Sequence, residues 1–361
     1  AAGVTPDRSL DRVGSVLVGN DGNHIYTTSL NYHQLTLFER NATNGSFAKA
    51  QELRAGMPDL ANMFTPTDFA ITPDGRFGYL TAANNDLLFA FSRDPSTGQL
   101  SFLERYENDM GGFSNLDFPV AVEVSPDGQT LYVIASNSHA LTTYSIDGTT
   151  GRLSPRQSFY EGVHGVTAMT TPQSLVVTPD GRQVAVSAVS DSALIVLDVE
   201  PGTGQRSLRE TISNVVYGYH STVSPDGRFV YIANRHSTEL AVFSREAISG
   251  VWTRLPAISS GVARLAGITI SPDGLSLYAA DESSGAVKAF DRDPSTGSLT
   301  EVQTLTDVAP HDLLSGASQV TMTPDGRHVL VGAPNDDSLT TFARLTTPGM
   351  ATPHEVTTTY Q

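Results

Sequence analysis

The sequence predicts an all-β fold, a seven-bladed β-propeller with four antiparallel strands in each blade. Three observations carry this prediction. A turn motif recurs at nearly constant spacing, apolar residues alternate along the short runs that flank it, and a second loop motif separates later runs. The chain has 361 residues, and no linker or low-complexity segment divides it. We therefore expect a single propeller domain over residues 1–361.

The turn motif is Pro-Asp-Gly, which occurs six times after one degenerate copy, Asn20-Asp21-Gly22. The aspartates of the six full copies are Asp74, Asp127, Asp180, Asp226, Asp273 and Asp325. Counted from Asp21 of the degenerate copy, the six steps from one aspartate to the next are 53, 53, 53, 46, 47 and 52 residues. A period of this length indicates one supersecondary unit that recurs along the chain. Seven copies predict seven units.

The residues on either side of the turn predict two strands of each unit. In the third unit Val122 and Val124 alternate with small or polar residues, and the apolar run 131–134 follows the turn. Alternating apolar residues bounded by turn signals are typical of strands. In the turn itself proline presets φ, aspartate bonds to the nearby backbone, and glycine takes the left-handed conformation. The motif is therefore a hairpin turn.

A second loop motif, Asp-Pro-Ser-Thr-Gly, predicts the third and fourth strands. It joins the runs 89–91 and 100–102, and it returns at 293–297. Four short antiparallel strands, with no amphipathic helix, describe a propeller blade. The seven units are predicted at 13–56, 67–110, 120–165, 173–213, 219–259, 266–308 and 318–360.

Two segments could supply the outermost strand of the seventh blade. Residues 354–360 resemble the outer-strand sequence at 300–304, so we expect them to take this place. The alternative is that residues 1–10 provide the strand and bind the two chain ends together.

Composition excludes several classes of function. There are 38 acidic and 22 basic residues, a net charge of −16, which argues against nucleic acid as a partner. Cysteine is absent, so thiol catalysis and disulfides are excluded. No apolar run approaches the ~18 residues of a membrane span. We expect a monomer without a cofactor. The start Ala1-Ala2-Gly3 favours a processed secreted or periplasmic protein over a cytoplasmic one, or a shortened sequence.

The repeat resembles that of a known family. The pattern Ser/Thr-Pro-Asp-Gly-Arg, then a strand ending in Ala-Asn, then Asp-Pro-x-Thr-Gly-x-Leu, is similar to the seven-bladed lactonase propellers. That family is typified by 6-phosphogluconolactonase and the carboxymuconate-lactonizing enzymes, and residues 91–100 and 290–299 match it closely. Surface-layer repeats built on Tyr-Val-Thr-Asn, and TolB-type repeats, share parts of the pattern. The resemblance implies a hydrolase or lactonizing cycloisomerase that acts on a small lactone.

Comparison of the blades in register suggests where a site lies. The loops that lead into the innermost strands, and those that join second to third strands, share one mouth of the central channel, and the Pro-Asp-Gly turns lie at the other. At the first mouth most blades offer small or amide residues, but blades five and six differ. The residues that break the pattern are Tyr217, Tyr219, His220, Asn234, Arg235 and His236 in blade five, Arg264, Asp281 and Glu282 in blade six, and Asp68 in blade two.

These residue types suit lactone hydrolysis. His220 would be the general base, Arg235 and Arg264 would bind an anion or oxyanion, and Glu282 or Asp281 would orient them. The expected ligand contacts are Tyr219, His236, Asp281, Asp68 and Gln173. A divalent-metal site of His220, His236 and these acids is a weaker interpretation, since no tight ligand spacing supports it, and we assign no metal.

The sequence departs from the family at the catalytic positions. The resemblance implies Pro-Arg-His before the strand and Asn-Glu after the next, whereas the chain has Gly218-Tyr219-His220 and Asn234-Arg235. An expected Pro-His is Pro172-Gln173. The alternative function is therefore a non-catalytic propeller that binds a ligand, glycan or protein, with Arg235 and an acid of blade six as a plain inter-blade ion pair.

Overall fold

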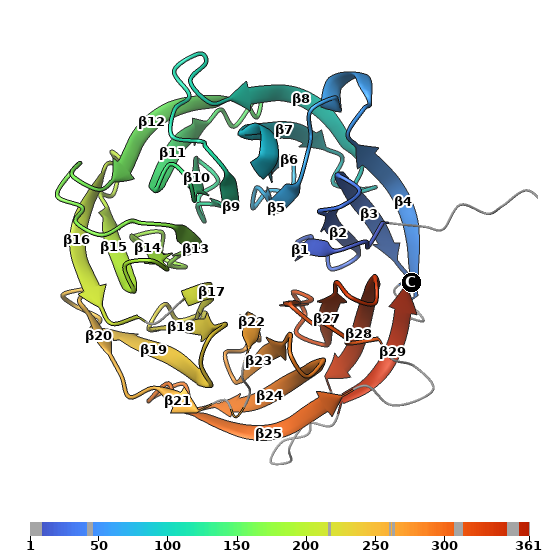
Figure 1. Ribbon diagram of the computed structural model, residues 1–361, viewed down its shortest axis with the longest axis vertical. Helices are drawn as coiled ribbons and strands as arrows, with labels where there is room; N and C mark the ends of the chain where they lie inside the picture. Colours follow the sequence, from blue (N-terminus) through green and yellow to red (C-terminus); the bar gives the residue numbers. More distant parts are fainter. Residues whose placement is uncertain are drawn as a thin grey trace, which may run out of the picture.

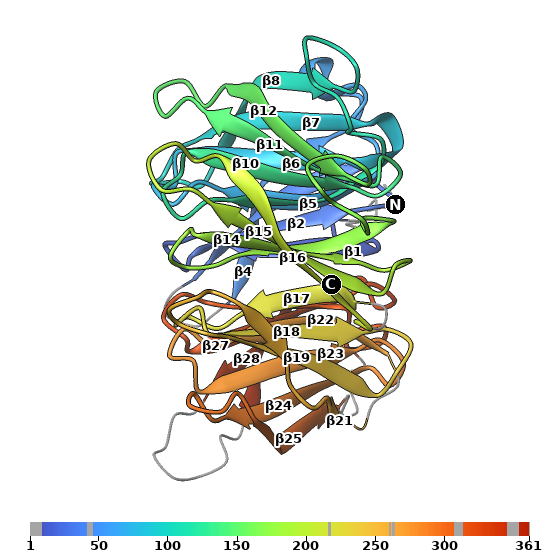
Figure 2. The same ribbon diagram turned by 90° about the vertical axis from the view of Figure 1, so that its left-hand side faces the viewer.

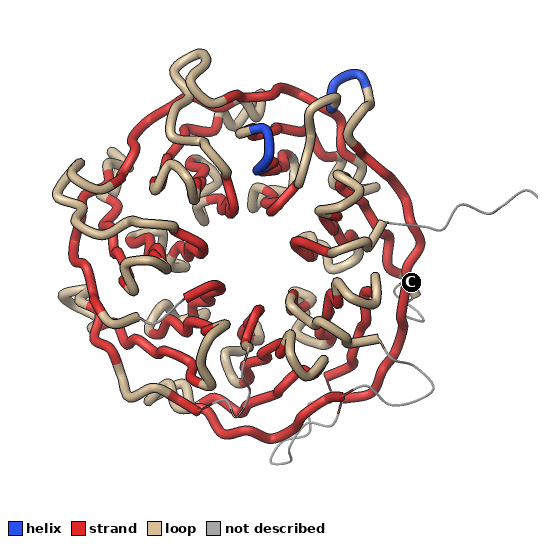
Figure 3. The backbone as a smooth tube through the Cα atoms, viewed as in Figure 1, coloured by secondary structure: helices blue, strands red, loops and turns tan. Residues whose placement is uncertain are grey.

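The computed structural model describes residues 9–41, 46–215, 218–259, 261, 264–306 and 313–344, and the backbone of 354–360. Seven antiparallel sheets stand around a central channel (Figure 1), and the ring is seen edge-on in Figure 2. The helices of the described residues are two 3-10 turns, η1 (Pro58–Leu60) and η2 (Ala83–Asn85), drawn blue in Figure 3. None of them is long enough to cross a membrane. The predicted all-β seven-bladed propeller is confirmed.

Each sheet runs from an innermost strand at the channel to an outermost strand at the rim. Blade one consists of β1 (Val13–Val18), β2 (His24–Ser29), β3 (Gln34–Arg40) and β4 (Phe47–Arg54). Blade two consists of β5 (Pro66–Ile71), β6 (Phe77–Ala82), β7 (Leu87–Arg93) and β8 (Leu100–Glu107). Blade three consists of β9 (Pro119–Val124), β10 (Thr130–Ala135), β11 (Ala140–Ile146) and β12 (Leu153–Tyr160). Blade four consists of β13 (Pro172–Val177), β14 (Gln183–Ala188), β15 (Ala193–Val199) and β16 (Arg206–Ser213).

The remaining three blades follow the same order. Blade five consists of β17 (Gly218–Val223), β18 (Phe229–Asn234), β19 (Glu239–Arg245), β20 (Trp252–Arg254) and β21 (Ile258–Ser259). Blade six consists of β22 (Leu265–Ile270), β23 (Ser276–Asp281), β24 (Ala286–Arg292) and β25 (Leu299–Thr306). Blade seven consists of β26 (Gln319–Met322), β27 (His328–Ala333), β28 (Ser338–Arg344) and β29 (His354–Tyr360).

The outer strands of blades five and seven bear on two details of the predicted fold. In blade five the fourth strand is split into β20 and β21, which both pair with β19. Pro256 lies between them and has no N–H to give to the ladder, which explains the break. In blade seven β29 pairs with β28. Residues 354–360 therefore form the outermost strand, as predicted, and the rival assignment to residues 1–10 is wrong.

The hydrophobic core lies between blades rather than at the ring's centre. Among the described residues, buried apolar side chains form seven clusters, one for each pair of neighbouring blades. The cluster between blades two and three, for example, joins Tyr79 and Leu88 to Leu131 and Tyr144, none of which is exposed. Because apolar burial drives this packing, the ring holds together while the channel at its axis stays free for polar groups.

The Pro-Asp-Gly turns form a tight ring at one mouth of the channel, called here the turn mouth. The serine or threonine before each proline donates its hydroxyl to the turn aspartate at 2.5–2.6 Å, which explains why that residue type recurs. Six of the seven turn glycines, each at positive φ, lie against the proline of the preceding blade, where an added Cβ would approach it to 3.4–3.8 Å. Repetition of this contact fixes the spacing of the blades.

Arginines and tyrosines tie neighbouring blades together near the same mouth. Arg93 of β7 pairs with Asp21 of the preceding blade at 2.5 Å and also donates to the Tyr26 hydroxyl. That hydroxyl donates in turn to the carbonyl of Gly98, in the Asp-Pro-Ser-Thr-Gly loop. Blades five and six repeat the second bond between Tyr231 and Gly297. The second loop motif thus provides an acceptor for the neighbouring blade.

A β-bulge recurs at the opposite end of the innermost strands. In blades one to six one residue is left out of the pairing between the first and second strands. These unpaired residues are Gly14, Thr67, Val120, Gln173, Tyr219 and Ala266. A bulge re-aims the side chains beside it and is often found next to a functional site.

Candidate functional site

A polar cavity of about 950 Å³ occupies the channel. It is lined by residues of the innermost strand of every blade and by the loops at the mouth away from the Pro-Asp-Gly turns, called here the loop mouth. None of the turn residues, all of which the structure describes, lines it. All six bulge residues do. The cavity therefore opens at the mouth where the blades differ most in sequence.

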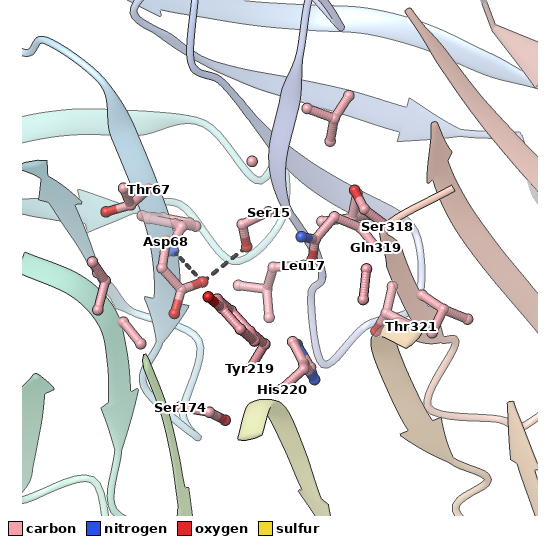
Figure 4. Close-up of a pocket in the computed structure, with 18 of the residues that line it drawn as sticks. Ser15, Leu17, Thr67, Asp68, Ser174, Tyr219, His220, Ser318, Gln319 and Thr321 are labelled. Carbon is pink, nitrogen blue, oxygen red and sulfur yellow. Dashed lines mark hydrogen bonds between the residues drawn. The ribbon is translucent and has the colours of Figure 1, made fainter. Parts of the chain in front are cut away.

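The bulge in blade five turns two consecutive side chains toward this cavity. Gly218 pairs with Asn234 and His220 pairs with Ala233, so Tyr219 is the extra residue. Both Tyr219 and His220 line the cavity, although successive residues of a regular strand would point to opposite faces. Figure 4 shows both projecting from the blade-five side, with Asp68 and Ser15 across from them.

His220 is held as a neutral imidazole. Burial lowers its pKa to about 4, because an imidazolium would lose most of its hydration there. Its Nδ1 is buried and has no hydrogen-bond partner in the part of the chain that the structure describes. A buried polar atom without a partner costs free energy, and such atoms are often found where a ligand or water supplies the missing hydrogen bond.

Arg235, Glu282 and Arg264 form a three-residue ionic cluster between blades five and six. Arg235 donates to one oxygen of Glu282 through both Nε, at 3.1 Å, and a terminal nitrogen, and its guanidinium lies 5.2 Å from the centre of the Tyr219 ring. Arg264 is 3.6 Å from the same oxygen and half-exposed. Arg235 and Glu282 line the cavity. The structure thus brings together three of the residues singled out from the sequence, with Tyr219 as a fourth.

Two of the sequence-predicted residues lie elsewhere. Asp281 is 1% exposed, and its carboxylate accepts hydrogen bonds from the hydroxyls of Ser283 and Ser284 at 2.7 and 2.5 Å. It caps the turn after β23 and does not line the cavity, so the predicted role as a ligand contact or orienting acid is not supported by its position. His236 packs edge-on against Tyr219, 5.8 Å between ring centres, outside the cavity lining. Tyr217 lies outside the described residues.

Asp68 and Gln173 both line the cavity, and both also connect blades. Asp68 accepts hydrogen bonds from the Ser15 hydroxyl at 2.8 Å and from the Val122 N–H at 3.0 Å, so one carboxyl group joins blades one, two and three. Burial raises its pKa to about 6, although these bonds act the other way. Gln173 donates to the Ser136 hydroxyl of blade three at 2.8 Å.

Glu123 is a cavity residue that the sequence comparison missed. It lies on β9, four residues before the turn aspartate, whereas the comparison used positions six before and ten after. Burial, with a smaller contribution from Asp68, raises its pKa to about 8. The Val177 N–H, 3.3 Å from Oε1, is its one hydrogen-bond donor among the described residues. Strand alternation places positions six and four before the turn on one side, and that signal could have found it.

The described residues contain no cluster of three or more histidines and acids of the kind that holds a metal ion. Two of the acids in the weaker interpretation, a divalent-metal site, are already engaged. The Asp281 carboxylate bonds within the turn after β23, and Glu282 is paired with two arginines. The chemistry available at the loop mouth is a neutral imidazole, a guanidinium–carboxylate cluster and two protonatable carboxyl groups on the channel wall.

Fold and cavity together define a seven-bladed propeller with a polar channel site at one mouth. The sequence matches the family model for the lactonase seven-bladed β-propellers over residues 16–169, 161–264 and 267–361. The chain therefore belongs to the lactonase family, and the family predicted from the repeat is confirmed. Among curated proteins none matches the sequence.

Solved structures share the fold at low sequence identity. A Bacteroides uniformis protein assigned as a 6-phosphogluconolactonase is 19% identical with a TM-score of 0.73, over 89% of this chain and 90% of that one. One from Bacteroides fragilis with the same assignment is 19% identical with a TM-score of 0.72, over 99% of both. The periplasmic gluconolactonase of Pseudomonas aeruginosa is 20% identical with a TM-score of 0.70, over 91% of both. At such identities the likeness is one of fold.

Proposed function

We propose that this protein hydrolyses a small lactone at the loop mouth of the channel, with His220 as the general base. The observation that supports the proposal most is the half-buried, neutral imidazole on the cavity wall, whose Nδ1 has no partner among the described residues. In the reaction a water oxygen attacks the lactone carbonyl carbon while His220 takes the water's proton. The ring C–O bond then breaks, and the proton passes to the leaving alkoxide.

Arg235 would stabilise the oxyanion that develops on the carbonyl oxygen. Glu282 and the Tyr219 ring hold its guanidinium in place, so little reorganisation is needed when charge develops. Arg264, half-exposed and 3.6 Å from Glu282, is free to meet a ligand at the rim. Glu282 thus serves to position the two arginines, the role that the sequence suggested for it. The same groups would act in the reverse, ring-closing direction.

A panel of five- and six-membered lactones, assayed by acid release, tests the proposal. His220→Ala should lower kcat/KM by at least ~100-fold, since a positioned general base contributes about 10²–10⁴. The exposed His164, outside the cavity lining, gives the matched control, and His164→Ala should retain full activity. For the wild type kcat/KM should fall as pH drops through about 4, because protonated His220 cannot accept a proton. Equal activity of the two variants would refute His220 as the base.

The second candidate is a binding propeller without turnover. It is favoured by the engagement of Arg235, whose guanidinium is bonded to Glu282 and covered by Tyr219. A base with a pKa near 4 is also a weak one. This candidate predicts that a ligand binds at the loop mouth while no lactone of the panel is hydrolysed faster than in buffer.

A further inference from the structure

Glu123 is exceptional among the residues at its register. Four residues before the turn aspartate the other blades carry uncharged side chains: Leu17, Ala70, Val176, Thr222, Thr269 and Thr321. Glu123 alone puts a carboxyl group on the channel wall at this depth. One oxygen has the single donor described above, at 3.3 Å, and the other has no partner among the described residues. The group is therefore available to a molecule in the channel.

Asp68 occupies the neighbouring wall of blade two and is better satisfied. Its oxygens accept three hydrogen bonds, from the Ser15 hydroxyl and the N–H groups of Phe69 and Val122. The burial of Glu123 and, to a smaller extent, the negative charge of Asp68 favour the protonated form of Glu123, whose pKa is raised to about 8. At neutral pH the Glu123 carboxyl is thus an O–H donor and acceptor rather than a charge.

The cations of the cavity lie only at its rim. Arg12 and Arg235 are the basic residues among those that line it in the described part of the chain, and both belong to loop-mouth segments. Arg235 is already neutralised by Glu282. Below the rim the polar lining consists of Asp68, Glu123, Gln173, the neutral His220, Gln319 and hydroxyl groups. An anionic group placed there would meet Asp68 with no counter-charge, and it would lose hydration as well.

We infer that the channel wall around Glu123 is a subsite for an uncharged, hydroxyl-rich ring, and that Glu123 discriminates against ligands with a phosphate or carboxylate group. The subsite deepens the proposed function and rests on it for the lactone carbonyl, which would face His220 while the ring hydroxyls face Glu123. The protonated carboxyl of Glu123 would donate to one ring hydroxyl, and the amide of Gln173 offers a further donor and acceptor nearby.

Binding alone tests the ligand class, with three ligands that share one ring and differ in charge. They are 1,5-anhydroglucitol, which is neutral, its 6-phosphate, which is anionic, and the corresponding cyclic amine, 1-deoxynojirimycin, which is cationic when its ring nitrogen is protonated. None has a lactone carbonyl, so no turnover interferes. Calorimetry or ligand-observed NMR at pH 7 should show the neutral ring binding at least ~10-fold more tightly than the phosphate. Tightest binding of the phosphate or of the cationic ring would overturn the inference.

Glu123→Gln separates this residue from the rest of the wall. Wild-type affinity for the neutral ring should fall at least ~3-fold from pH 7 to pH 9, as Glu123 ionises and loses its proton. The Gln variant should show no such fall, because an amide keeps its donor. Other titratable groups around Glu123 do not change over this range: Asp68 stays ionised, and His220 and Tyr132 stay neutral.

Glu107→Gln makes the same chemical change on the outer strand β8, and it should behave as the wild type. A pH-dependent affinity that persists in Glu123→Gln would overturn the role of Glu123. The outcomes also separate this inference from the proposed function. Neutral-ring binding without hydrolysis of any lactone would refute the hydrolase and leave the subsite standing. Hydrolysis that prefers phosphorylated lactones would refute the neutral-ring subsite and leave the hydrolase standing.

Discussion

The two mouths of the channel are built from the same seven repeats, but one carries contacts that recur in many blades and the other carries residues that differ between blades. At the turn mouth the same polar contacts recur from blade to blade: hydroxyl to aspartate, arginine to the aspartate of the preceding blade, and tyrosine to the second loop. At the loop mouth the blades differ, and His220 and Glu123 hold polar atoms without partners among the described residues. The stabilising contacts of the turn mouth are repeated, whereas His220 and Glu123 each occur in one blade only.

The contrast shows how a repeat fold can carry a site. The inter-blade bonds of the turn mouth offset the free energy that is lost by burying unpartnered groups at the loop mouth. Substitutions at the two ends should therefore behave differently. Those at the turn mouth should lower the free energy of unfolding, and those at the loop mouth should change ligand chemistry while keeping or raising stability.

The largest expected effect is at the turn mouth. Arg93 is almost fully buried and bonds to Asp21, to the Tyr26 hydroxyl and to the Gly75 carbonyl. Arg93→Met leaves these acceptors without their cation, so the free energy of unfolding should fall by about 3 kcal/mol, as for other broken buried pairs. Denaturant titration measures it. Activity well below the melting temperature should be unchanged.

Arg105 provides the comparison for Arg93. It lies on the outer strand β8, 3.9 Å from Glu107, and both side chains are exposed. Arg105→Met should cost no more than ~1 kcal/mol, the usual range for an exposed pair. If the two arginine variants proved equally stable, the inter-blade bonds of the turn mouth would not be what holds the blades together.

A smaller effect of opposite sign is expected at the loop mouth. The pKa of Glu123 is about 8 in the folded protein and about 4.3 in an unfolded chain. The folded state therefore binds the proton more tightly. This contribution is fully present below pH ~4.3 and is lost as pH rises toward 8. Glu123→Gln lacks this loss, so relative to the wild type it should gain ~2 kcal/mol at pH 8. That figure is below the full linkage value because solvent in the channel screens the charge.

Thermal or denaturant unfolding across pH 4–9 measures the difference in unfolding free energy between Glu123→Gln and the wild type. Glu107→Gln serves as the control, whose difference from the wild type should not change with pH. A stability difference between Glu123→Gln and the wild type that does not change with pH would mean that Glu123 is already ionised in the folded protein. The raised pKa, and with it the donor at the channel wall, would then be wrong.

Most of the fold follows from local sequence. The turn aspartates give the number of blades, and the likeness of residues 354–360 to 300–304 correctly identifies the closing strand β29. These features could be predicted because a tight turn depends on residues next to each other in the chain. The split of the outer strand in blade five also had a local signal, Pro256, although the repeat pattern predicts one unbroken strand there.

The site was only partly predictable, because its contacts join residues far apart in the chain. Arg235 and Glu282 are 47 positions apart, and only the assembled ring shows that the Arg235 guanidinium donates to the Glu282 carboxylate. Asp281 could have been assigned to its turn, since the serines that it accepts from follow two and three residues later. The bulge at Tyr219 had no clear local signal, yet it decides that both Tyr219 and His220 reach the cavity.

The central claim is that function resides at the loop mouth, on the blade-five side of the channel. A crystal structure of the protein soaked with the hydrolysis product of its best lactone tests it most directly. We predict density in the channel cavity, with the new carboxylate within ~3.2 Å of His220 or Arg235 and the hydroxyls of the opened chain toward Glu123. Ordered ligand at the turn mouth or on the outer rim, with the channel cavity empty, would contradict the account.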